Sequence, residues 1–113
     1  MAMAFEPGRI VMVAFPFTDR TTTKIRPVLV VSSKVYNSGE DFVAVPISSR
    51  LAPDGYQILS TESYFRATML RCDSTIKWTK VMTLSRVIVT RQLGCVPDEV
   101  LKQVQELIRG VFS

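Results

Sequence analysis

The apolar positions of the chain fall into short runs separated by polar turns, which is the pattern of strands. Residues 9–17, RIVMVAFPF, are rich in β-branched and aromatic side chains and follow the breaker pair Pro7-Gly8. Residues 28–31 are apolar at every position, which predicts a strand buried on both faces. Residues 41–47 predict a third strand. The first half of the chain is therefore expected to form a sheet.

Further extended segments are predicted in the second half of the chain. They cover residues 56–60, 67–73 and 86–91, with a less certain segment at 73–85. Polar loops are predicted at 18–25 and 48–55, with a turn at 37–39. Because the connections are short, a twisted sheet or small barrel is favoured over parallel βαβ units.

The period of the apolar positions changes near the C-terminus. Pro97 suits a first helical position, and Asp98 and Glu99 complement the positive end of a helix dipole. Six apolar residues then recur at helical spacing: Val100, Leu101, Val104, Leu107, Ile108 and Val111. One amphipathic helix is predicted here, and the fold class is mainly β with helices (α+β).

The length of 113 residues predicts a single domain spanning residues 1–113. The sequence has no apolar run long enough to span a membrane and no basic-then-apolar leader, so a cytoplasmic protein without membrane association is expected. In that setting Cys72 and Cys95 are predicted to be reduced core residues.

The charge balance bears on function. With 14 Lys and Arg against 10 Asp and Glu, the net charge of +4 favours a polyanionic partner. The chain has no histidine, which removes the commonest general base and metal ligand. It also lacks a metal-ligand cluster and a Gly-rich phosphate loop. We therefore expect no metal or cofactor, and chemistry from carboxylate, hydroxyl, thiol, Lys or Arg groups.

Such groups suffice to cleave RNA, whose 2′-hydroxyl supplies the nucleophile. Arg26 can hold two phosphate oxygens, and Ser48 can donate one hydrogen bond. Arg71 and Asp73, two apart on a predicted strand, would share a face as phosphate ligand and proton acceptor. These residues also have structural interpretations. Arg26 can be an ordinary surface charge, Ser48 a turn-forming serine, and Arg71 with Asp73 a simple ion pair.

Polar and basic residues of the two predicted loops extend this set into a path for an RNA backbone. The candidates are Thr18, Arg20, Lys24, Ser49 and Arg50. Trp78 and Tyr64 can stack on bases, although a lone tryptophan is more often a core or interface residue.

Four motifs follow one another along the chain. They are PGRIV with FPF at residues 7–17, RPVLVVS at 26–32, VPISS at 45–49 and RCD at 71–73. In this order and spacing, the sequence resembles the MazF/PemK toxin family over essentially its whole length.

The resemblance implies an SH3-like β-barrel of the CcdB/PemK/MazF type with helices packed on it, acting as a homodimer. It also implies metal-independent cleavage of single-stranded RNA, leaving a 2′,3′-cyclic phosphate and a 5′-hydroxyl. A cognate antitoxin protein is the implied partner, and operator DNA is bound only through the toxin–antitoxin complex.

The family's site residues map onto four positions. Arg26 matches the arginine before the buried strand, and Ser48 stands where many members have a catalytic threonine. Arg71 and Asp73 match the Arg-Cys-Asp of the PemK branch, which assigns them base and acid roles. Because an arginine side chain stays protonated at any working pH, electrostatic stabilisation is the role expected of both arginines. The PemK branch also uses a histidine, which this chain lacks.

Two other functions fit the same fold. One is a CcdB-like toxin that binds and inhibits DNA gyrase, and the other is an inactive module that only binds its antitoxin. A gyrase binder has no need of Arg26, Ser48 and the Arg71/Asp73 pair together, which favours the nuclease.

Overall fold

The computed structural model of the protein describes residues 5–16 and 23–113. Its elements, in chain order, are β1 (Arg9–Pro16), β2 (Thr23–Val30), α1 (Lys34–Asn37), β3 (Asp41–Ser48), β4 (Tyr56–Ile58), α2 (Phe65–Thr68), β5 (Ser74–Ile76), β6 (Met82–Ser85), the 3-10 helix η1 (Arg86–Ile88), β7 (Val89–Cys95) and α3 (Asp98–Phe112). No helix in these two ranges is long and apolar enough to cross a membrane.

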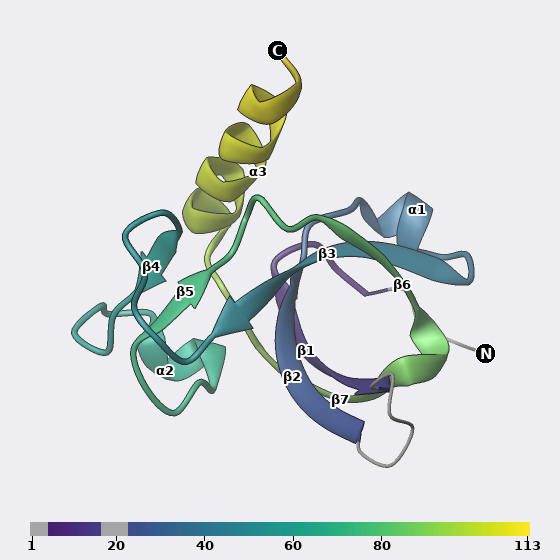
Figure 1. Ribbon diagram of the computed structural model, residues 1–113, viewed down its shortest axis with the longest axis horizontal. Coiled ribbons are helices and arrows are strands. Elements are labelled where there is room, and N and C mark those ends of the chain that lie inside the picture. The colour runs from purple at the N-terminus through teal and green to yellow at the C-terminus, as the bar shows by residue number, and fades with distance from the viewer. Residues whose placement is uncertain (1–4, 17–22) are drawn as a thin grey trace.

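All strand pairings are antiparallel, and the order across the sheet is β4-β5-β3-β2-β1-β7, with β6 also paired to β3. This confirms the predicted α+β class. Strands β1, β2, β3, β6 and β7 curl around a common centre, while β4, β5 and α2 lie to one side (Figure 1). The hydrogen-bonded path stays open, because β6 and β7 are joined through η1 rather than by a strand ladder.

The central strands are buried on both faces, as the uniformly apolar residues 28–31 predict. Val28 packs with Val11 and Val13 in a cluster inside the curl of the sheet. Leu29 packs with Ile10 in a second cluster on the outer face, which α3 covers. Since side chains alternate along a strand, the two faces carry two separate apolar cores.

Helix α3 confirms the predicted amphipathic helix, with one correction at its start. Pro97 is the N-cap, with extended backbone, and not the first helical residue. Val100 and Val104 are buried on the outer core, but Leu107 and Val111 are 38% and 56% exposed. In the second half of the apolar stripe, Ile108 packs against the outer core, whereas Leu107 and Val111 stay exposed among the described residues.

Three predicted segments differ from the structure. Strand β2 begins at Thr23, so part of the predicted loop at 18–25 belongs to the sheet. Residues 67–73 are not extended. Helix α2 ends at Thr68, its C-cap Met69 has a left-handed φ of 61°, and an irregular segment follows. Residues 86–91 begin as η1 because the Ser85 hydroxyl accepts a hydrogen bond from the Val87 amide and starts a turn.

The cysteine prediction is half right. Cys72 and Cys95 are unpaired, as predicted, but both are exposed rather than in the core. Cys72 lies in the irregular segment before β5, and Cys95 ends β7 at the rim of the sheet. Position outside or at the end of a strand, rather than residue type, decides their exposure.

Candidate functional site

The candidate site lies where two neighbouring strands diverge. Strands β2 and β3 pair only from Val30↔Ala44 to Val28↔Pro46. Beyond that point β2 continues against β1, whereas β3 continues against β5 (Figure 1). Arg26 and Ser48 each lie two residues past the last pair, one on each arm of this fork. Backbone divergence therefore opens the sheet between the two residues that the sequence singles out.

Strand alternation places Arg26 and Ser48 on the same face. Arg26 shares a face with Val28, Ser48 shares a face with Pro46, and Val28 and Pro46 are direct partners. A hollow of about 430 Å³ lies on this face, the fork pocket, lined by Phe15, Arg26, Pro46, Ile47, Ser48, Lys77, Lys80 and Met82. Among the described residues its lining has three cationic side chains and no carboxylate, so it suits an anion.

The hydroxyl of Ser48 accepts a hydrogen bond from the Arg50 amide at 3.2 Å, which is the turn-forming contact expected of a serine there. Its own proton remains able to donate. Buried Thr75 fixes the same loop, donating to the Arg50 carbonyl at 2.8 Å and accepting from the Ala52 amide at 2.9 Å. Two hydrogen bonds with Thr75 of β5 thus fix the residues after β3.

A second hollow of about 410 Å³, the outer pocket, also reaches Arg26. Arg71 and Arg91 stand at its border with Ser49, while Met12, Ile47 and Leu93 supply apolar walls. Its lining has no Asp or Glu. Because consecutive residues point in opposite directions at the end of β3, Ser48 borders the fork pocket and Ser49 the outer pocket.

The predicted pairing of Arg71 with Asp73 on a strand is wrong, because the segment before β5 is irregular. Asp73 Oδ1 accepts a hydrogen bond from the Ser60 amide at 2.6 Å, which ties this segment to the turn after β4. Asp73 borders neither pocket, whereas Arg71 borders the outer one. The structure therefore brings Arg26 and Ser48 together, and sets Arg71 beside Arg26 without Asp73.

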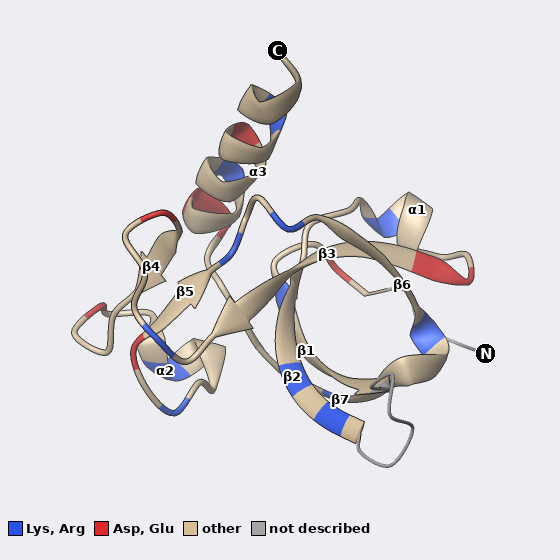
Figure 2. Ribbon diagram, viewed as in Figure 1, with Lys and Arg blue, Asp and Glu red and all other residues tan. Residues whose placement is uncertain are grey.

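The predicted RNA-binding residues divide in a similar way. Thr18 and Arg20 lie outside the described residues. Lys24 is exposed on the part of β2 that pairs with β1 alone. Ser49 and Arg50 are exposed after β3. Basic residues lie near the start of β2 and along the connection from β5 to β6 (Figure 2).

Three basic residues of the two pockets escaped the sequence analysis: Lys77, Lys80 and Arg91. The lysines belong to residues 73–85, where the pattern is ambiguous. The Lys77 amide donates to the Pro46 carbonyl at 2.9 Å, so the β3–β5 pairing brings this segment to Ser48. Nothing in the local sequence signals that contact, because it joins residues about 30 positions apart.

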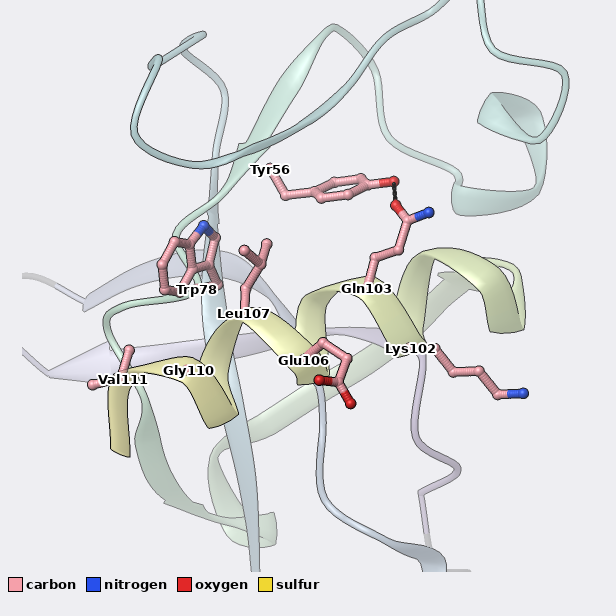
Figure 3. Close-up of a pocket in the computed structure, with 8 residues that line it drawn as sticks. All are labelled: Tyr56, Trp78, Lys102, Gln103, Glu106, Leu107, Gly110 and Val111. Carbon is pink, nitrogen blue, oxygen red and sulfur yellow. Dashed lines mark hydrogen bonds between the residues drawn. The ribbon is translucent and has the colours of Figure 1, made fainter. Parts of the chain in front are cut away.

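A larger hollow than these two, about 760 Å³, lies between α3, Tyr56 and Trp78 (Figure 3). Its walls are mostly apolar, with Leu107 and Val111 on the helix side. The Tyr56 hydroxyl donates to Gln103 Oε1 at 2.6 Å. With no cluster of cations and hydroxyls, this hollow fits a packing surface better than a catalytic site.

Tyr64 packs against the outer apolar core, and burial raises its pKa to about 12, with smaller contributions from Tyr56 and Glu62. Its hydroxyl therefore stays protonated at physiological pH. Among the described residues, no group of three or more Cys, Asp or Glu side chains is placed to hold a metal ion.

The fold is that of a small β-rich protein, with two hollows lined by cationic side chains at a strand fork. Residues 6–112 match the model of a family described as PemK-like, MazF-like toxin of type II toxin–antitoxin system. The chain belongs to this toxin family, which confirms the resemblance seen in its motifs.

Solved structures agree on the fold. A MazE–MazF complex from Deinococcus radiodurans matches with a TM-score of 0.79 at 20% identity, covering 98% of this chain and 97% of that one. The MazF structure from the same organism gives 0.74 at 21% identity, covering 98% of each chain. Mycobacterium tuberculosis toxin MazF-mt6 gives 0.69 at 18% identity, covering 92% and 95%. A comparison with curated proteins found no match.

Proposed function

We propose that this toxin is a metal-independent, sequence-selective endoribonuclease that cleaves single-stranded RNA through attack by the 2′-hydroxyl. The observation that carries the proposal is the fork pocket. There Arg26 and Ser48 face one hollow from two diverging strands, beside Lys77 and Lys80 and without a carboxylate in the lining. Cations and a hydroxyl donor without a metal-ligand cluster suit a reaction whose nucleophile comes from the substrate.

In the proposed reaction the 2′-oxygen forms a bond to phosphorus and loses its proton, and the bond from phosphorus to the 5′-oxygen breaks. The 5′-oxygen takes up a proton, so the products are a 2′,3′-cyclic phosphate and a 5′-hydroxyl. Arg26 holds the non-bridging oxygens as negative charge grows on them, and Ser48 donates a further hydrogen bond. Donors preorganised in this way stabilise the transition state more than the ground state.

Arg71, on the outer pocket beside Arg26, is proposed to add electrostatic stabilisation from the far side of the fork. Asp73 uses one carboxylate oxygen to hold the Ser60 amide. Asp73 borders neither pocket, so its proposed part as proton acceptor rests on the other oxygen and on RNA that reaches beyond the two pockets. Lys24, Ser49 and Arg50, with Thr18 and Arg20, are proposed to contact the RNA backbone on either side of the cut.

The assignment of the catalytic hydroxyl to Ser48 rather than Ser49 can be tested directly. We expect Ser48→Ala to lower kcat/KM for RNA roughly tenfold or more, since one donor to the transition state is lost. Ser49→Ala should have a smaller effect, because its side chain borders the other pocket. Single-turnover cleavage rates of the two variants measure the difference. Equal losses, or a larger one for Ser49→Ala, contradict the assignment.

We also propose a cytoplasmic homodimer that binds a cognate antitoxin, as the MazF chains do in the MazE–MazF structures, and that contacts operator DNA only in that complex. The uncovered half of α3 supports a protein partner. Leu107 and Val111 are exposed there and line the apolar hollow beside Trp78 (Figure 3), and Phe112 is also exposed.

A charge placed on this face should disrupt the dimer. We expect Leu107→Glu to shift the protein from dimer to monomer in light scattering coupled to size-exclusion chromatography, because a buried unpaired carboxylate is costly. Arg109→Ala, which changes the net charge by the same amount at a position of α3 outside the lining of this hollow, serves as the control. A Leu107→Glu protein that stays dimeric with wild-type circular dichroism contradicts this choice of interface.

The experiment that tests the proposed function is incubation of the purified toxin with a long single-stranded RNA in excess chelator, followed by mapping of the cut ends. Cuts at a recurrent short sequence establish the nuclease. If folded, antitoxin-free protein leaves diverse RNAs intact but arrests growth when expressed, a binding toxin such as a gyrase inhibitor replaces the nuclease. If growth also continues, the chain is an inactive antitoxin-binding module.

A further inference from the structure

The outer pocket has a border of positive charge that the cleavage reaction as described does not use in full. Arg91 of β7 borders it together with Arg71 and Arg26, and its lining contains no Asp or Glu. All three arginines are exposed. Three like charges around one hollow repel one another unless an anion lies between them. The pocket therefore fits an anionic ligand.

A β-bulge places Arg91 at this pocket. On β1, Met12 pairs with Arg91 and the next residue, Val13, pairs with Val89, so Thr90 is an extra residue on β7. The Thr90 hydroxyl donates to the Met12 carbonyl at 3.3 Å, across the bulge. Bulges of this kind redirect a side chain and occur often beside functional sites. Val89 packs inside the curl of the sheet. Without the extra residue, side-chain alternation from Val89 would place Arg91 on that inner face as well.

The pocket is not suited to phosphate alone. Met12, Ile47 and Leu93 form apolar walls beneath the arginines, and Met69 and Leu70 close one side. Its volume of about 410 Å³ lies in the range of roughly 300–1,000 Å³ typical of small-molecule sites. A ligand with a flat apolar part and an attached anionic group satisfies both halves. An unstacked nucleotide has this composition, since its base packs on apolar surface while its phosphate binds arginine.

Arg26 borders both the outer pocket and the fork pocket, so one strand of RNA passing the fork can occupy both. We propose that the outer pocket binds the nucleotide next to the cut, with Arg91 as the substrate-binding residue that holds its phosphate. This inference rests on the proposed RNA cleavage and adds a second subsite to it.

The test uses binding as well as cleavage. A fluorescently labelled short oligonucleotide of 2′-deoxynucleotides, which cannot react, is titrated with wild type, Arg91→Ala, Arg91→Lys and Arg109→Ala at several salt concentrations. We expect Arg91→Ala to weaken binding roughly tenfold and to reduce the slope of log affinity against log salt by about 0.7, the value for one phosphate contact on a single strand. Arg91→Lys should keep the slope.

Arg109→Ala removes the same charge from the exposed face of α3, where Arg109 pairs with Glu106 and borders neither pocket. It should leave affinity and slope close to wild type. Equal losses in Arg91→Ala and Arg109→Ala mean a general charge effect and overturn the subsite. Wild-type binding by a folded Arg91→Ala protein overturns it as well. Wild type that binds through Arg91 without cutting RNA rejects the nuclease alone.

Discussion

Replacing Arg26 by alanine is expected to lower kcat/KM for RNA cleavage by about 10²–10³-fold, the loss typical of removing one preorganised donor to a transition-state charge. Arg26 and Ile47 line both pockets, and Arg26 lies on the part of β2 beyond its last pair with β3. No other cationic side chain borders both hollows within the described residues. Single-turnover rates at subsaturating protein measure the loss of kcat/KM.

Arg26→Lys is the matched variant, since it keeps the charge and removes the bidentate geometry. We expect it to recover part of the rate and nearly all of the affinity for the 2′-deoxy oligonucleotide. Arg26 is exposed, so both variants should unfold at close to the wild-type temperature. A folded Arg26→Ala protein that cuts RNA at the wild-type rate contradicts the assignment of the fork pocket as the reaction centre.

Gly94→Ala is expected to destabilise the protein by about 3 kcal/mol and to lower Tm by roughly 12 °C, at the upper end of the effect of inserting one methyl group into a packed site. Gly94 is buried in β7 at a second bulge, where Leu93 and Gly94 lie between the pairs Arg9↔Cys95 and Val11↔Gln92. A Cβ there would lie 1.8 Å from the Ala67 carbonyl oxygen and 2.7 Å from the Thr68 carbonyl carbon. These are backbone atoms of α2, so no side chain can rotate away.

Because α2 leads into the segment that carries Met69 and Arg71, its displacement should also disturb the outer pocket. Gly110→Ala is the control: its Cβ would have nothing within 4 Å, and alanine is favoured over glycine in a helix by about 1 kcal/mol. Thermal unfolding followed by circular dichroism should show opposite shifts for the two variants. A Gly94→Ala protein as stable as wild type would mean that α2 does not pack on β7 as described.

Much of the fold follows from local patterns. The apolar runs at 9–17, 28–31 and 41–47 correspond to β1, the end of β2 and β3, and the period of Val100, Leu101 and Val104 predicts α3. The errors fall where local signals are weak. Helix α1 depends on one turn capped by Ser33, and α2 depends on the close approach that Gly94 permits. Neither has an apolar period long enough to detect.

The site was predictable in part for a similar reason. Arg26 and Ser48 belong to the recognisable motifs RPVLVVS and VPISS, so the sequence identifies them. Their common face depends on the register of β2 with β3, and the position of Arg91 depends on a bulge of a single residue. A one-residue change of register reverses the face of every side chain, and composition carries no information about it. The hydrogen bond from the Ser60 amide to Asp73 likewise cannot be predicted from the sequence, because it joins two loops that only the fold brings together.

The most direct test of the central claim compares two oligonucleotides that differ only in the 2′-hydroxyl at the mapped cut site. Each is incubated with the toxin in excess chelator, and the product ends are identified by mass spectrometry. The proposed mechanism predicts that the all-ribose oligonucleotide gives a 2′,3′-cyclic phosphate and a 5′-hydroxyl, and that the single 2′-deoxy substitution abolishes the cut. Cleavage of both oligonucleotides at equal rates would show attack by water and contradict the account.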